Sequence, residues 1–152
     1  MSETFFDSRT PRFSLPLLFA GQTQKEGFVN EIAARLDALV HLVVEGAAAT
    51  PPADPADGQN WLVSDDSGGA WSGRSGEIAA RQSGNWLFIE PRTGMKLFNK
   101  AAGQEMYFHG TWKAADRPSS PQGGTIVDSE SRAAIAAIIA ALTTAGIVGG
   151  VT

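Results

Sequence analysis

The sequence predicts an α+β fold, in which an N-terminal helix packs on a small antiparallel β meander or barrel and a C-terminal helix serves oligomerisation. Three observations predict it: helical periodicity before residue 46, short apolar runs separated by glycines over residues 59–116, and an Ala-rich helical run after residue 128. At 152 residues the chain is long enough for one ordinary domain with its own core.

The first part of the chain combines a flexible tail, residues 1–12, with an extended segment and an amphipathic helix, residues 13–46. Thr23 is the predicted N-cap, and Glu26 three residues later completes a capping box. Gly46 predicts the end of this helix. The side chains that form its apolar face recur three and four positions apart: Phe28, Ile32, Leu36, Leu39, Val40 and Val43.

The middle of the chain reads as a Pro-rich linker, residues 47–58, followed by an antiparallel β domain, residues 59–116. The repeated prolines of the linker favour an extended, polyproline-like conformation. In the β domain, short runs such as 86–89 are rich in aromatic and aliphatic residues and are bounded by glycine-containing turns. Strands of this length and spacing indicate a meander or a small barrel.

The C-terminal part begins with a second linker, residues 117–128, and continues as an assembly helix and tail, residues 129–152. Asp128 or Ser129 is the expected N-cap, and Gly146 the expected stop. Apolar residues form a heptad-like stripe on this Ala-rich helix, namely Ile135, Ile138 and Leu142, followed by Ala145. The helix either folds back onto the β domain or pairs with other copies, and we favour pairing.

The composition indicates which kinds of partner the chain can bind. Hydrophobic residues make up 43% of the chain and charged residues 18%, with a net charge of −4 and no cysteine. Low charge fits a subunit that buries surface against copies of itself. The acidic balance predicts no nucleic-acid partner, and no segment reaches the ~20 apolar residues that membrane insertion needs. The lack of cysteine removes disulfides and thiolate chemistry.

No residue pattern indicates catalysis. The two histidines, His41 and His109, have no Gly-x-Ser-x-Gly motif with which to form a triad. Asp65 and Asp66 do not have the spacing of an EF-hand, although a weak Ca²⁺ site there stays open. We therefore predict no enzyme, no catalytic residue, no cofactor and no metal; a polysaccharide-degrading enzyme is a third and distant hypothesis.

Aromatic residues give one candidate binding function. All four tryptophans lie in the predicted β domain. Trp rings fill small cores, but exposed ones beside Asn and Gln also stack on the flat faces of sugars. Three of them are candidate glycan-stacking residues: Trp71, Trp86 and Trp112.

A longer motif carries a resemblance. Residues 15–26 read LPLLFAGQTQKE and are followed by Asn30-Glu31 and by LDALV at residues 36–40. With later matches such as Trp61-Leu62-Val63, this pattern resembles a domain of unknown function found in alphaproteobacterial prophages and gene transfer agents, over residues 15–114. The resemblance implies a virion-associated setting, commonly head spikes, head fibres and tail-fibre regions, and it implies no catalytic residues.

We therefore expect a structural virion component: a head spike or fibre base, an adaptor or a tail-associated subunit, assembled in the bacterial cytoplasm. Its expected partners are copies of itself, as a trimer or ring, and other virion proteins. The alternative is a non-catalytic module that binds host-surface polysaccharide. The candidate assembly contacts lie at the start of the first helix and along the second: Gln22, Gln24, Lys25, Ile135, Ile138 and Leu142.

Overall fold

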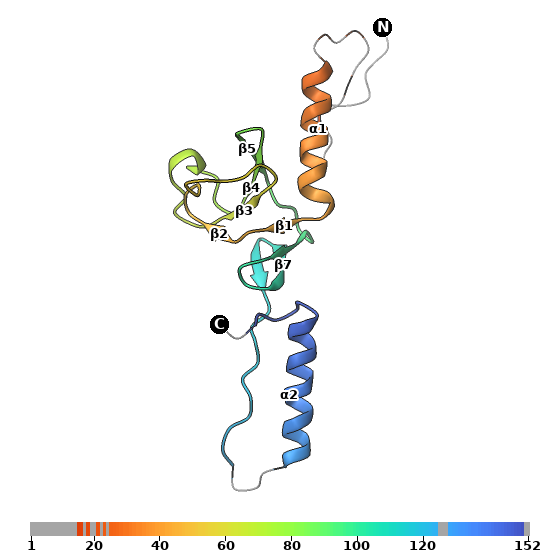
Figure 1. Ribbon diagram of the computed structural model, residues 1–152, viewed down its shortest axis with the longest axis vertical. Coiled ribbons are helices and arrows are strands. Elements are labelled where there is room, and N and C mark those ends of the chain that lie inside the picture. The colour runs from red at the N-terminus through yellow and green to blue at the C-terminus, as the bar shows by residue number, and fades with distance from the viewer. Residues whose placement is uncertain are drawn as a thin grey trace.

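A computed structural model describes residues 15, 16, 18, 21, 23, 25–124 and 128–150. Helix α1 (Lys25–Val40) and helix α2 (Ser129–Thr144) project from opposite ends of a β body, so the molecule is elongated (Figure 1). The body contains a 3-10 turn, η1 (Gly69–Trp71), and these strands: β1 (Val43–Val44), β2 (Ala47–Ala48), β3 (Asn60–Val63), β4 (Ile78–Gln82), β5 (Asn85–Ile89), β6 (Lys96–Asn99), β7 (Gln104–His109) and β8 (Thr111–Ala114).

The strands form two four-stranded sheets, which confirms the predicted α+β class. One sheet has the order β1-β6-β7-β8 and the other β2-β3-β4-β5. The hairpin pairs within each sheet are antiparallel, as expected, whereas β1 pairs with β6 and β2 with β3 in parallel. Residues 43–48 thus contribute one short strand to each sheet and tie the two sheets together.

Helix α1 ends at Val40, earlier than the stop predicted at Gly46. Tertiary pairing explains the difference. The Leu42 carbonyl accepts from the Phe98 amide at 3.0 Å, and the Val44 carbonyl accepts from the Lys100 amide at 2.9 Å. The side chain of Val44 is fully buried. β-Branched residues at 43 and 44 fit this strand as well as they fit the apolar periodicity of a helix, so periodicity alone overextended the helix.

Two core clusters lie on the two faces of the β3-β4 pair. Along β4, Ile78 and Ala80 point to one cluster and Ala79 to the other, as the alternation of a strand requires. The first cluster is the larger and includes the end of α1: Ala38, Leu42, Val44, Leu62, Ile78, Ala80, Ile89 and Leu97. The second consists of Val63, Trp71 and Ala79, with Trp61, Trp86 and Phe88 packed against it.

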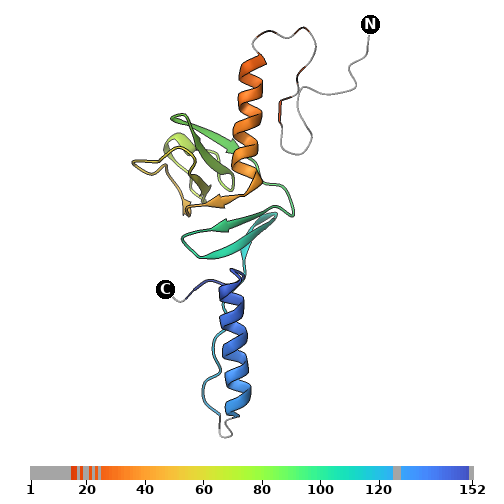
Figure 2. The ribbon, with the colours of Figure 1, turned by 45° about the vertical axis from the view of Figure 1, so that its right-hand side comes forward.

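Helix α2 begins where the sequence predicts, because the Asp128 carboxylate accepts from the Ser131 amide at 2.9 Å and caps it. The chain runs outward from β8 along residues 115–124 and returns through α2, so the C-terminal end of the helix meets the body (Figure 2). There the Glu105 amide donates to the Gly146 carbonyl at 2.6 Å, and Ala115 pairs with Val148.

Candidate functional site

The surface of α2 is the first candidate site. Residues 133–142 are all Ala, Ile or Leu, so every side of the helix is apolar. Within α2 the only buried residue is Ile139, while the side chain of Ile138 is 59% exposed and that of Ile135 38% exposed. Helices that are apolar all round are normally enclosed by other protein or by lipid. No helix in the described part of the chain is long and apolar enough to cross a membrane.

Among the described residues, the extended segment before α2 contacts one side of the helix. The Arg117 guanidinium donates to the Thr143 hydroxyl at 2.9 Å, and the Arg132 guanidinium donates to the carbonyls of Pro121 and Gly123. At about 100° per residue, Arg132 and Thr143 share the side of the buried Ile139. The extended segment therefore lies against that side.

The opposite side of α2 is an exposed row of small residues, Ala134, Ala137 and Ala141. Ile138 flanks this row and is the most exposed large side chain of the helix. Of the predicted assembly residues on α2, Ile135 and Ile138 are exposed and Leu142 is half-buried. The row of alanines was not among the predicted contacts, although its spacing of three and four is visible in the sequence.

The predicted assembly residues near α1 are not brought to this surface. Lys25 is exposed and is the first residue of α1, which projects from the other end of the body. Gln22 and Gln24 lie outside the described residues.

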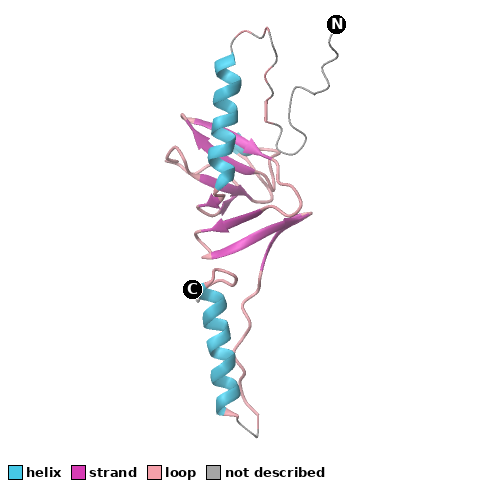
Figure 3. Cartoon of the chain, turned by 90° about the vertical axis from the view of Figure 1, so that its right-hand side faces the viewer, coloured by secondary structure: helices cyan, strands magenta, loops and turns pink. Residues whose placement is uncertain are grey.

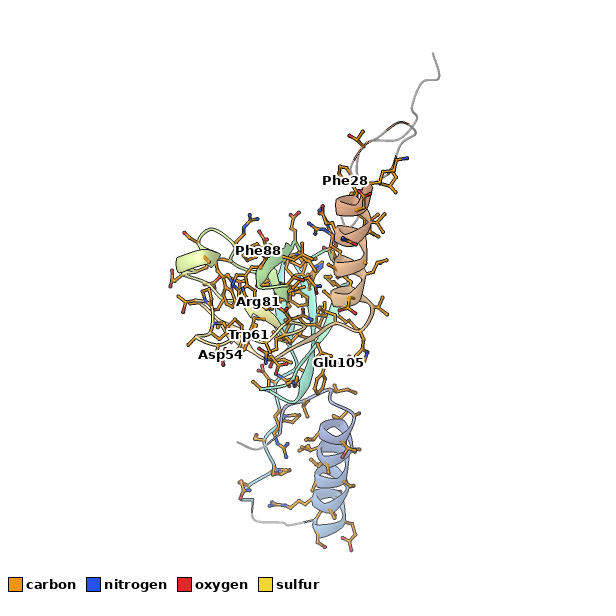
Figure 4. The ribbon with its side chains drawn as sticks, turned by 45° about the horizontal axis from the view of Figure 1, so that its top comes forward. Phe28, Asp54, Trp61, Arg81, Phe88 and Glu105 are labelled. Atoms are coloured by element: carbon orange, nitrogen blue, oxygen red, sulfur yellow. The ribbon has the colours of Figure 1, made fainter. Side chains whose placement is uncertain are left out.

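A groove of about 900 Å³ between the two sheets is the second candidate site. Half-buried aromatic side chains line it: Phe88 from β5, Phe108 from β7 and Trp112 from β8. The Trp112 ring is held in place, because its Nε1 donates to the Gly76 carbonyl at 2.9 Å and its centroid lies 5.3 Å from that of Phe108. Figure 4 shows Phe88 on the β body beside α1.

Two pairs of oppositely charged side chains line the groove. The Arg74 guanidinium lies 4.7 Å from the Phe88 ring centroid and 3.4 Å from the Glu77 carboxylate. Arg92 and Glu90 approach to 3.2 Å. The groove therefore combines aromatic faces with paired charges that can both donate and accept hydrogen bonds, and it has no strong charge of one sign.

The three predicted glycan-stacking tryptophans differ in position. Trp71 is 0% exposed and packs edge-on against Trp86, with centroids 5.0 Å apart. A ring without an accessible face cannot stack on a sugar, so Trp71 is a core residue and its selection as a platform was wrong. Trp86 is half-buried, with the Arg81 guanidinium 5.0 Å from its centroid. Trp112 alone of the three lines the groove.

Phe88 and Phe108 also line the groove and were not among the predicted glycan-stacking residues. Nothing in the sequence shows that their strands, from two different sheets, meet at one groove. Asp65 also lines the groove, next to Asp66 in a turn with a φ of 58°. No group of three or more potential metal ligands occurs among residues 25–124 and 128–150 or at the other described positions.

A known protein family matches the part of the chain that contains most of these elements. Residues 29–113 match the family of proteins of unknown function DUF2793. The chain belongs to this family. The DUF2793 match takes in most of α1, both sheets and the groove, and ends before α2. A search of curated proteins found no match.

Proposed function

We propose that the protein is a structural subunit of a phage or gene-transfer-agent-like particle and that it self-associates through α2. The observation that carries the proposal is the uncharged, largely exposed run of residues 133–142 on a helix that projects from the body. The resemblance of the opening motif to prophage and gene-transfer-agent domains supports the virion setting, at a head spike or fibre base, an adaptor or the tail.

The energetics favour association over exposure. Full burial of an Ile side chain contributes about 1.5–3 kcal/mol, so covering Ile138, which is 59% exposed, contributes about 1–2 kcal/mol for each copy. Alanines on the open side allow neighbouring helices to approach closely, toward the short end of the 8–10 Å range of helix–helix distances. Copies of α2 therefore provide a surface of the right chemistry and shape to cover one another.

The test compares the molar mass of the wild-type protein and Ile138→Glu by light scattering across a range of concentrations. We expect the wild type to be oligomeric and Ile138→Glu to dissociate, because a buried unpaired carboxylate is costly. Ser72→Glu introduces the same charge at an exposed position directly after η1 and should leave the mass unchanged. A monomeric wild type at every concentration would sink the self-association.

The virion setting needs a separate measurement. Mass spectrometry of purified particles from the producing strain should detect the chain, and cryo-electron microscopy should place it at the head or the tail. Particles that lack the chain would contradict the virion role even if the purified protein is oligomeric.

The groove favours a second candidate function, non-catalytic binding of host-surface polysaccharide. Its aromatic faces and paired charges are the groups that stack on sugars and hydrogen-bond their hydroxyls. Phe108→Ala should weaken binding to host polysaccharide at least several-fold. Tyr107→Ala is the matched control, because successive side chains of β7 point to opposite faces and Tyr107 does not line the groove. Equal binding by wild type and Phe108→Ala would exclude this site.

A further inference from the structure

The outward face of α1 carries a second apolar stripe. Val29, Leu36 and Val40 are 47%, 44% and 81% exposed, and exposed Ala33 lies between them. Their spacing of four, three and four residues is that of the a and d positions of a coiled coil. A soluble helix ordinarily turns such a stripe toward its own core.

The body fixes the orientation of α1 and prevents this. Ala38 is buried in the first core cluster, and the Arg35 guanidinium donates to the Phe88 carbonyl at 3.3 Å while it contacts Glu31 at 3.0 Å. At about 100° per residue, the stripe lies within about 40° of the direction opposite Ala38. The stripe therefore faces away from the sheets, where a second copy of the chain can cover it.

The axes of the two helices are roughly collinear. In Figures 1 and 2, α1 and α2 follow the same long axis at opposite ends of the β body. The sheets and the outgoing segment of residues 115–124 lie on one side of that line in Figure 1, and α1 lies in front of the sheets in Figure 3. The uncovered sides of α1 and α2 are thus turned in a similar direction.

The position of α2 is set by contacts and not by the helix alone. A Cβ placed on Gly146 would lie 3.2 Å from the Phe98 ring, and residues 146 and 148 bond to β7 and to Ala115. The body therefore holds both helices, so one neighbouring copy can meet both stripes without a rearrangement.

We propose that copies of this chain assemble in parallel around an axis that runs along both helices, with α1 as a second self-association seam and the β bodies on the outside. This inference rests on the proposed self-association through α2. The occupant of the α1 stripe is the same stripe of another copy, because parallel packing sets identical heptad layers side by side. The same arrangement leaves the groove free on the outside of the assembly.

Parallel packing also places the α1 stripe of one copy against the α1 stripe of the next, and the open side of α2 against the open side of α2. The α1 stripe has three branched side chains and one alanine, whereas the open side of α2 is mainly alanine, so the two prefer different distances between helix axes. Antiparallel packing would pair α1 of one copy with α2 of the next. Acidic residues flank both surfaces, Asp37 on α1 and Glu130 on α2, so charge does not distinguish the mixed pair from the parallel one, and the preference rests on shape.

The test uses single cysteines, which are unambiguous because the chain has none of its own. Leu36→Cys reports on the α1 seam and Ala137→Cys on α2. Ser72→Cys, at an exposed position directly after η1, is the control. Each variant is treated with a short bismaleimide crosslinker and analysed on denaturing gels, after circular dichroism has shown that it folds as the wild type does.

Crosslinked species from Leu36→Cys and from Ala137→Cys, but not from Ser72→Cys, are the expected result. Crosslinks from Ala137→Cys alone would overturn the α1 seam and leave association through α2 intact. Crosslinks only when Leu36→Cys and Ala137→Cys proteins are mixed would show antiparallel packing and overturn the proposal. Val40→Arg, at the most exposed position of the stripe, should also raise the dissociation constant at least tenfold; no change would count against the seam.

Discussion

Replacing Trp71 tests the assignment of this residue to the core. Its side chain is fully buried among Val63, Ala79 and the edge of Trp86. A glycan-stacking residue would instead need an exposed ring. Trp71→Ala leaves a cavity the size of an indole ring. Because the 3-10 turn η1 ends at this residue, the cavity also removes the contact that holds the turn on the sheet.

The size of the effect follows from the burial. Replacing a buried Trp with Ala costs about 3–5 kcal/mol, and loss of the edge contact with Trp86, at 5.0 Å, falls within the upper part of that range. Trp71→Phe should cost clearly less. It keeps an aromatic ring and removes Nε1, which is buried and makes no hydrogen bond with the described residues; such a donor costs about 1–3 kcal/mol.

Urea unfolding followed by circular dichroism measures both variants. Tyr107→Ala, which removes a half-exposed aromatic side chain, is the control and should change the free energy of unfolding by about 0.5 kcal/mol or less. A loss below about 1 kcal/mol for Trp71→Ala would refute the burial argument. An equal loss for Trp71→Phe and Trp71→Ala would refute the argument from the unpaired donor.

Three further predictions concern the helices and their ends. Hydrogen bonds from the Ser131 amide and hydroxyl lower the pKa of Asp128. The charged cap therefore stabilises α2 at pH values above the ordinary pKa of Asp, and this stabilisation is lost as the pH falls through the lowered pKa. The helical circular dichroism signal should fall in acid, and it should fall less in Asp128→Asn. Gly27→Ala, inside α1 with open space around it, should stabilise the fold by about 0.5–1 kcal/mol. Gly146→Ala, at a φ of +69° and against Phe98, should destabilise it by about 1–2 kcal/mol or more in the same urea experiment.

The elements that depend on local chemistry were predictable from the sequence. The cap at Asp128 and the start of α2 follow from one side chain and the run after it. The hairpins follow from glycine-bounded runs. The end of α1 and the strand at Ala47–Ala48 were not predictable, because both depend on parallel pairing with strands more than ten residues away.

The exposure of each tryptophan likewise could not be predicted from the sequence. Trp71 and Trp112 are equally hydrophobic and both follow glycine-rich turns, yet one is sealed in a cluster and the other lines a groove. Their difference is set by which sheet each contacts and by which partner covers it. The open helix faces are intermediate cases: the sequence shows the spacing of the α1 stripe, but only the burial of Ala38 shows that it points outward.

The two candidate sites are physically separable, and that separation decides how the function can be tested. The groove lies within residues 29–113, which the DUF2793 family shares, whereas the apolar run of α2 lies beyond them. Ile138→Glu should therefore weaken assembly while each copy keeps its groove, and Phe108→Ala should leave the molar mass unchanged. If polysaccharide binding exists and depends on several copies, Ile138→Glu would weaken binding to long chains far more than binding to short oligosaccharides, because only the long chains gain from multivalency.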